Sequence, residues 1–122
     1  MPNVALERID LSVEEAAAGL KHHAIVLVDV REPAEFAAER IHGPLNFPLS
    51  TFDPAALTAL PAEMVVLQCG TGKRSGIAAD RCREAGLAIR RHLAGGIGAW
   101  KAAGLPVISL DAGSGQVRDR SA

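Results

Sequence analysis

Apolar runs alternate along the chain with segments in which apolar residues recur at helical spacing. Residues 24–30 and 64–68 are short, continuous runs rich in β-branched residues. Such runs are typical of strands that are buried on both faces of a parallel sheet. Weaker patterns predict further strands at residues 5–9, 45–47 and 88–95.

Helices are predicted between these strands. Ser12 and Glu15 form a capping box ahead of a helix over residues 13–20, and Pro33 favours the first turn of a short second helix. Three more helices are expected at residues 50–61, 75–86 and 97–104, ended by a proline or a glycine. Strands alternating with helices predict an α/β fold, with helices on both faces of a mostly parallel sheet.

The ends of the two strongest strands carry polar and reactive side chains. Asp29 and Arg31 lie at the end of the first strand, and Cys69 follows the second. The carboxyl ends of parallel strands share one edge of a sheet, and ligands bind at that edge. We therefore expect these three residues to lie close together.

Composition narrows the class of protein. The chain has 122 residues, 48% hydrophobic and 22% charged, which fits one soluble domain over residues 1–110. The remaining residues, 111–122, are polar without periodicity and are expected to form a mobile tail. A net charge of −1 with 3% aromatic residues argues against a nucleic-acid partner. No signal peptide or membrane segment is visible, so a cytoplasmic protein without a membrane partner is expected.

The chain has two cysteines, Cys69 and Cys82, without the paired spacing of zinc sites. Its four histidines are scattered and form no recognisable ligand set with a cysteine or a carboxylate. No metal site and no cofactor are expected, and both cysteines are interpreted as thiols in a reducing compartment.

The loop after the second strong strand reads CGTGKRS, from Cys69 to Ser75. A nucleotide-binding P-loop would need glycine where the chain has Leu67, and a hydroxyl residue where it has Arg74. A cysteine phosphatase would need its arginine six residues after the cysteine, but Arg74 comes one position early. The ring of backbone N–H groups is then one residue too short for phosphate.

A nucleophilic thiolate is the third interpretation of this loop. Cys69 lies between a strand and a helix, where unsatisfied N–H groups and the helix dipole favour a negative charge. Gly70 and Gly72 allow successive N–H groups to turn inward, and Lys73 and Arg74 add positive charge. These features predict a lowered cysteine pKa. A buried, inert cysteine in an ordinary turn is the structural alternative.

Cys82 is predicted to be a core residue. It lies seven residues beyond Ser75 on the apolar face of the predicted helix, about 10 Å along the axis from the helix start. Disulfides need Cα atoms within about 7 Å, so no bridge to Cys69 is expected.

Three ordered segments of the chain resemble the single-domain rhodanese-like sulfurtransferases. They are residues 27–50 (LVDVREPAEFAAERIHGPLNFPLS), residues 68–75 (QCGTGKRS) and residues 93–107 (LAGGIGAWKAAGLPV). The resemblance implies a sheet of about five parallel strands. It also implies a catalytic Cys69 and a substrate cradle made by the loop residues Gly70, Thr71, Gly72, Lys73, Arg74 and Ser75. In this family a six-residue loop goes with sulfur transfer, and a seven-residue loop with phosphate or arsenate.

These observations lead to a functional hypothesis. Cys69 would take a sulfane sulfur from a small anionic donor such as thiosulfate and pass it, through a persulfide, to a thiophilic acceptor. The acceptor would be cyanide, a small thiol reductant or a protein thiol. Two alternatives stay open: a persulfide carrier or interaction module with little turnover, and a phosphatase or arsenate reductase.

Overall fold

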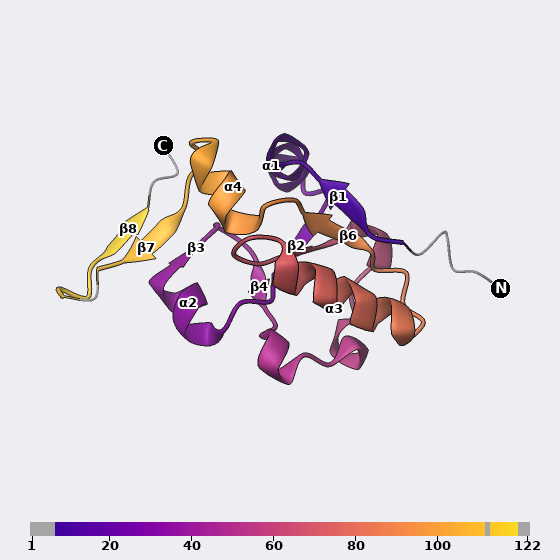
Figure 1. The fold of residues 1–122 in the computed structure, drawn as a ribbon. Coiled ribbons are helices and arrows are strands. Elements are labelled where there is room, and N and C mark those ends of the chain that lie inside the picture. The colour runs from indigo at the N-terminus through magenta and orange to yellow at the C-terminus, as the bar shows by residue number, and fades with distance from the viewer. Residues whose placement is uncertain (1–6, 112, 120–122) are drawn as a thin grey trace.

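The computed structural model describes residues 7–111 and 113–119, and its centre is a five-stranded parallel sheet (Figure 1). The strand order is β1-β6-β5-β2-β4, and every neighbouring pair is parallel. These strands are β1 (Ile9–Leu11), β2 (Val26–Asp29), β4 (Leu45–Asn46), β5 (Val65–Gln68) and β6 (Arg91–Leu93). The predicted α/β class and parallel sheet are confirmed.

Helices cover both faces of this sheet. Helices α1 (Val13–Lys21) and α4 (Gly96–Ala102) lie on one face, and α3 (Lys73–Glu84) lies on the other (Figure 1). Alternation along β5 explains the two cores, because Val66 packs toward α1 and α4 while Val65 and Leu67 pack toward α3. All four residues of β5 are buried, as expected for a central strand of a parallel sheet.

Two helix starts follow from local sequence. Ser12 Oγ accepts a hydrogen bond from the N–H of Glu15, whose carboxylate accepts one from the N–H of Ser12, each at 3.0 Å. This confirms the predicted capping box. Helix α2 (Pro33–Ala38) begins at Pro33 as predicted, and its Glu35 carboxylate accepts from the N–H of Glu32 at 3.1 Å.

The helix predicted over residues 50–61 is absent. Residues 49–64 contain three 3-10 turns instead, at Leu49–Thr51, Pro54–Leu57 and Ala62–Met64. Pro54 lacks an N–H group and disfavours helical geometry at the residue before it. The carboxylate of Asp53 then caps a new turn by accepting from the N–H of Ala55 at 3.0 Å. The apolar spacing was correct in one respect, since Leu57 is fully buried against the sheet.

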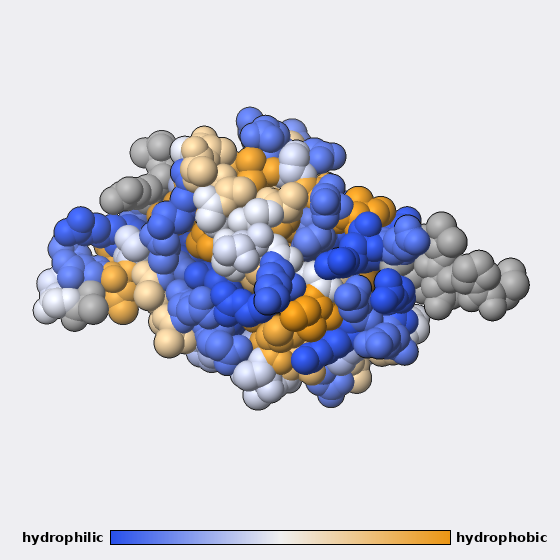
Figure 2. Space-filling view, viewed as in Figure 1, coloured by the Kyte–Doolittle hydropathy of each residue, from blue (hydrophilic) through white to orange (hydrophobic). Residues whose placement is uncertain are grey.

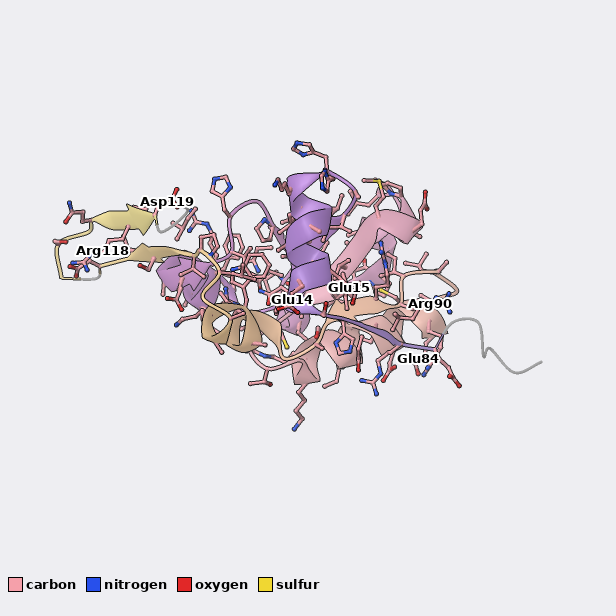
Figure 3. All side chains as sticks on the ribbon, turned by 90° about the horizontal axis from the view of Figure 1, so that it is seen from above. Glu14, Glu15, Glu84, Arg90, Arg118 and Asp119 are labelled. Carbon is pink, nitrogen blue, oxygen red and sulfur yellow. The ribbon has the colours of Figure 1, made fainter. Side chains whose placement is uncertain are left out.

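A second, antiparallel sheet was not predicted. It joins β3 (Glu39–Arg40), β7 (Ile108–Leu110) and β8 (Val117–Asp119) in the order β3-β7-β8. Seen from above, the hairpin with Arg118 and Asp119 projects away from α1, which carries Glu14 and Glu15 (Figure 3). Strand β8 lies within the segment 111–122 that was expected to be a tail. The mobility of this segment stays a prediction.

The first strand also differs in its bounds. It was predicted at residues 5–9, of which 5 and 6 lie outside the described residues, and β1 runs from Ile9 to Leu11. Among the described helices, none combines the length and the apolar character that crossing a membrane requires.

Candidate active site

Cys69 lies directly after β5, where the chain turns into the loop that leads to α3. This loop occupies the middle of the view in Figure 1. Gly72 has a φ of +102°, a left-handed conformation that glycine adopts without strain. The turn at Gly72 bends the loop back over the cysteine, and its N–H donates to Cys69 Sγ at 3.0 Å. Cys69 is completely buried.

Several hydrogen-bond donors converge on this sulfur atom. Backbone N–H groups of Thr71, Gly72 and Ser75 face it, and Ser75 Oγ lies 3.6 Å from it. Burial raises the pKa of Cys69, because desolvation disfavours a charged thiolate. The hydrogen bonds from Ser75, Gly72 and Thr71 together outweigh burial, so the net pKa is lowered. This is the direction that the sequence predicted.

The start of α4 supports the loop from behind. The N–H of Ile97 donates to the carbonyl of Cys69 at 2.8 Å, and the N–H of Gly98 donates to the carbonyl of Gly70 at 3.0 Å. Gly96 permits this approach, since a Cβ atom at that position would lie 2.2 Å from the Cys69 carbonyl oxygen. The glycines before α4 therefore hold the backbone of the cysteine in place, a role that sequence reasoning did not assign.

The two cations of the loop differ in environment. Arg74 forms a two-pronged ion pair with Glu35 of α2, at 2.6 and 3.0 Å. The hydrogen bond from Arg74 lowers the pKa of Glu35 to about 2. Lys73 is exposed. Figure 2 shows hydrophilic side chains gathered over α2 and the start of α3. The charge of Arg74 is thus offset by a carboxylate, and Lys73 is the more available of the two cations.

Asp29 and Arg31 join the strand ends beside the loop, as expected. Arg31 donates to both Asp29 carboxylate oxygens, at 2.9 to 3.1 Å, and Gln68 Nε2 donates to Asp29 Oδ2 at 2.6 Å. Asp29, Arg31 and Gln68 are all buried. This network ties the end of β2 to the residue before Cys69, which places Asp29, Arg31 and Cys69 at one edge of the sheet.

Sequence reasoning missed two polar residues behind the loop. His92 of β6 is 7% exposed, and its Nδ1 lies 2.9 Å from Ser75 Oγ. Its other nitrogen, Nε2, lies 2.7 Å from Asp10 Oδ1. Asp10 and His92 are directly opposite each other in the β1–β6 ladder. The missed signal was strand register, because two residues 82 positions apart become neighbours only when β1 pairs with β6.

Cys82 lies within α3 and packs against the sheet with Ala78 and Ala79. It is completely buried, and both cysteines are free. Burial raises the pKa of Cys82 to about 11. The prediction that Cys82 is a core thiol is confirmed.

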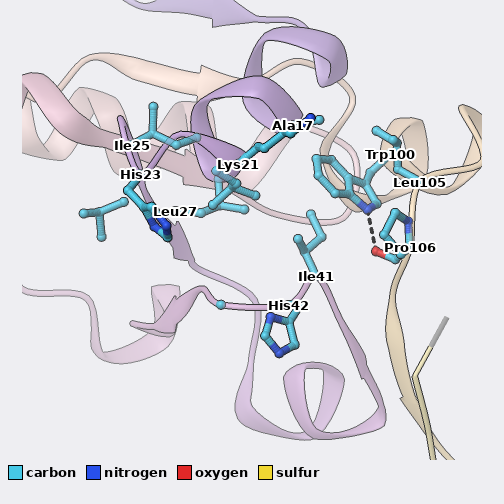
Figure 4. A pocket seen from close by; sticks show the side chains of 13 residues that line it. Ala17, Lys21, His23, Ile25, Leu27, Ile41, His42, Trp100, Leu105 and Pro106 are labelled. Carbon is cyan, nitrogen blue, oxygen red and sulfur yellow. Dashed lines mark hydrogen bonds between the residues drawn. The ribbon is translucent and has the colours of Figure 1, made fainter. Parts of the chain in front are cut away.

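A cavity of about 510 Å³ opens elsewhere, between α1, the start of β2 and the end of α4. Figure 4 shows Leu27, Ile41 and Trp100 around it, with Trp100 Nε1 donating to the Pro106 carbonyl at 2.8 Å. None of the loop residues 69–75 lines this cavity. Within residues 7–111 and 113–119, no three acidic, histidine or cysteine side chains gather as metal ligands would.

Comparison with known proteins places the chain in a family. The model of the rhodanese-like domain matches residues 12–103. A sulfurtransferase of Allochromatium vinosum is 35% identical over 86 residues, which are 70% of this chain and 79% of that protein. An uncharacterised protein of Synechocystis is 45% identical over 85 residues, 70% of this chain but about half (48%) of that longer protein.

A solved structure extends the comparison. The thiosulfate sulfurtransferase of Pseudomonas aeruginosa superimposes with a TM-score of 0.74 and 26% identity, covering 91% of this chain and 21% of that one. The region that the family model matches, residues 12–103, includes the loop that begins at Cys69 and the start of α4 that supports it. The chain therefore belongs to the rhodanese-like family and is homologous to sulfurtransferases.

Proposed function

We propose that this protein transfers a sulfane sulfur from thiosulfate, or a similar small anion, to a thiophilic acceptor through a persulfide on Cys69. The observation that carries the proposal is the set of N–H groups from Thr71, Gly72 and Ser75 that face the Cys69 sulfur. A thiolate is the nucleophilic form of cysteine, and these donors stabilise it in a fully buried position.

The first step would be an attack by the Cys69 thiolate on the outer sulfur of thiosulfate. An Sγ–S bond forms while the S–S bond of thiosulfate breaks, and sulfite leaves with the electron pair. The resulting persulfide anion carries its negative charge on the outer sulfur, which is bonded to Sγ. Donors arranged as a ring can stabilise this anion as an oxyanion hole stabilises oxygen.

The second step would return the enzyme to its starting state. Cyanide, or a thiolate acceptor, attacks the outer sulfur and displaces the Cys69 thiolate. With cyanide the product is thiocyanate, and charge is conserved in both steps. No redox partner or cofactor is required by this double displacement.

The surroundings of Cys69 favour a small anionic donor. Cys69 is completely buried, and the loop from Cys69 to Arg74 has six residues, the length that the family resemblance associates with sulfur transfer and not with phosphate. Lys73 is exposed beside the loop and would attract an anion over a distance set by ionic strength. Arg74 would mainly hold the start of α3 against α2, because Glu35 already binds its guanidinium.

Intact mass measurement after incubation with thiosulfate tests the proposal. The wild-type protein should gain the mass of one sulfur atom, and added cyanide should remove it with release of thiocyanate. Cys69→Ser should show neither change. Cys82→Ala is the matched control, because it removes the other buried thiol from a helix that tolerates alanine, and it should load like wild type.

The same experiment separates the alternatives. Stoichiometric loading on Cys69 with negligible thiocyanate turnover would identify a persulfide carrier in place of an enzyme. Loading of Cys69→Ser equal to wild type would contradict the proposal. Hydrolysis of an aryl phosphate that depends on Cys69, without sulfur loading, would replace it with phosphatase chemistry.

A further inference from the structure

A chain of four polar side chains runs from the buried sulfur to the protein surface. Cys69 Sγ lies 3.6 Å from Ser75 Oγ, which lies 2.9 Å from His92 Nδ1, while His92 Nε2 lies 2.7 Å from Asp10 Oδ1. The four residues come from the end of β5, from α3, from β6 and from β1. Three of the four are buried, and the Asp10 side chain is 75% exposed.

The single hydroxyl proton of Ser75 limits which hydrogen bonds among these four side chains can form at the same time. The hydroxyl group has one proton to donate and can accept from other groups. It lies within reach of Cys69 Sγ and His92 Nδ1, and it can instead donate its proton to the Gly72 carbonyl at 3.1 Å. Ser75 therefore cannot donate to a thiolate and to an unprotonated Nδ1 at the same time.

Two states use the Ser75 proton for the contacts between sulfur, hydroxyl and imidazole, and in both the Gly72 carbonyl still accepts from the Gly76 N–H at 3.1 Å. In the first, the Cys69 thiol donates to Ser75 Oγ, Ser75 donates to His92 Nδ1, and His92 Nε2–H donates to Asp10. In the second, His92 is an imidazolium whose Nδ1–H donates to Ser75, and Ser75 donates to the Cys69 thiolate. The two states differ only in the position of two protons.

We propose that His92 is the base that deprotonates Cys69 through Ser75, and that Asp10 stabilises the imidazolium. This inference deepens the proposed sulfur transfer by naming how its nucleophile is formed. The S–H bond of Cys69 breaks as an O–H bond forms on Ser75. The original Ser75 proton moves to His92 Nδ1, leaving a thiolate and an imidazolium, so no proton is lost to or taken from solvent. His92 thus positions Ser75 and accepts a proton, and it acts on Cys69 through Ser75 without contacting the sulfur donor.

Among the residues that the structure describes, the other charged groups near these four side chains do not provide an equivalent route. On the loop side, Arg74 is paired with Glu35 of α2, and the Asp29–Arg31 pair closes the end of β2. Next to β1, Arg8 is 3.7 Å from Asp80 of α3. The start of α4, residues 96–98, presents glycine and isoleucine and no titratable side chain. Exposed Lys73 lies beside the loop and contributes positive charge that favours the thiolate.

A purely structural role for His92 makes a different prediction from a proton-accepting role. Asparagine can occupy the Nδ1 position of histidine and hydrogen-bond Ser75, but it cannot accept a proton in this pH range. If His92 only holds Ser75, His92→Asn should leave the ionisation of Cys69 unchanged. If His92 accepts the proton, the same variant should make the thiolate harder to form.

The test is the rate of Cys69 alkylation by iodoacetamide as a function of pH, with Cys82→Ala as the background so that one thiol is observed. We expect His92→Asn to react about tenfold more slowly at neutral pH, with its profile displaced by about one pH unit to higher pH. At high pH the two profiles should converge, because hydroxide then removes the proton. Asp10→Asn should slow the neutral reaction by about threefold, since its carboxylate is largely exposed and screened.

Profiles that superimpose for wild type and His92→Asn would overturn the proposal. A rate reduced by the same factor at every pH would also overturn it, because that result indicates disturbed packing. Circular dichroism and thermal melting check folding. If His92→Asn does not fold, the exposed Asp10→Asn variant decides, and an unchanged profile rejects the relay. The assay contains no sulfur donor, so its outcome does not depend on whether thiosulfate is the substrate.

Discussion

The two cysteines of this protein are equally buried, but their pKa values are shifted in opposite directions. Both have no exposed surface. Cys82 is surrounded by apolar groups of α3 and the sheet, and burial raises its pKa to about 11. Cys69 pays the same kind of desolvation cost, but the N–H groups and the hydroxyl of its loop lower its net pKa.

The difference lies in the backbone around each sulfur. Inside α3 the N–H groups are bonded within the helix, so Cys82 has no donor to stabilise a charge. At the start of α3 the first N–H groups have no partners in the helix, and Gly72 turns them toward Cys69. Within α3 a buried thiol therefore has a raised pKa, while N–H groups at and before the start of the helix lower the net pKa of Cys69, which precedes it.

The largest effect expected from this comparison is in alkylation of the two thiols. At neutral pH, iodoacetamide should modify Cys69 on the order of 100-fold faster than Cys82, because the thiolate fraction falls tenfold for each unit by which the pKa exceeds the pH. Peptide mapping of a time course gives both rates in one sample. Equal rates would show that the loop donors do not activate Cys69.

A smaller effect is expected from moving the backbone that holds Cys69. Gly96→Ala would place a Cβ atom 2.2 Å from the Cys69 carbonyl oxygen, and should reduce sulfur loading by at least about tenfold through displacement of the loop. It should also lower the free energy of unfolding by at least about 2 kcal/mol. Loading kinetics and chemical denaturation measure the two effects.

Gly104→Ala is the matched control for that variant. Gly104 has a φ of +77°, against +60° for Gly96, but a Cβ atom there would meet nothing within 4 Å. It should cost about 1 kcal/mol of stability, from the left-handed conformation alone, and leave loading unchanged. Equal loss of loading in both variants would show that backbone strain, and not contact with Cys69, causes the defect.

The smallest effect is expected from the ion pair beside the loop. Glu35→Gln should destabilise the protein by less than about 1 kcal/mol, because both side chains of the pair are about a third exposed. The pKa of Glu35 is lowered from 4.5 to about 2 in the folded protein. Its stabilisation is therefore complete above about pH 4.5 and is lost as pH falls through 2.

Thermal melting of wild type and Glu35→Gln between pH 7 and pH 2 checks this linkage. The difference in melting temperature should be constant near neutrality and should disappear toward pH 2. Alkylation of Cys82 should not change, since the pair lies at the other end of α3. A difference that grows on acidification would contradict the assignment of the Glu35 pKa.

Sequence patterns predicted the parts of the fold that depend on local physics. The continuous apolar runs at β2 and β5, the capping box at Ser12 and the glycine-rich turn after Cys69 can each be recognised within a few residues. The 3-10 turns around Leu57 were missed because Pro54 and Asp53 outweigh apolar spacing there. Strand β8 was missed because all three of its residues are exposed, so it has no apolar signal.

The candidate site divides in the same way. Cys69 and its loop were identified because their residues are contiguous. Asp10 and His92 were not, because they meet only through the parallel pairing of β1 with β6. The contact of Gly96 with the Cys69 carbonyl depends on the path of the chain from β6 into α4. Contacts of this kind need the folded structure, whatever the strength of the local motif.

The central claim is that Cys69, although completely buried, is the thiol that ionises readily while Cys82 does not. The most direct measurement is the ultraviolet absorbance of thiolate across a pH titration of wild type, Cys69→Ser and Cys82→Ala. We predict one thiolate that forms below the ordinary pH range of cysteine, kept in Cys82→Ala and lost in Cys69→Ser. A low-pH thiolate that persists in Cys69→Ser, or one that is absent from wild type, would contradict the account.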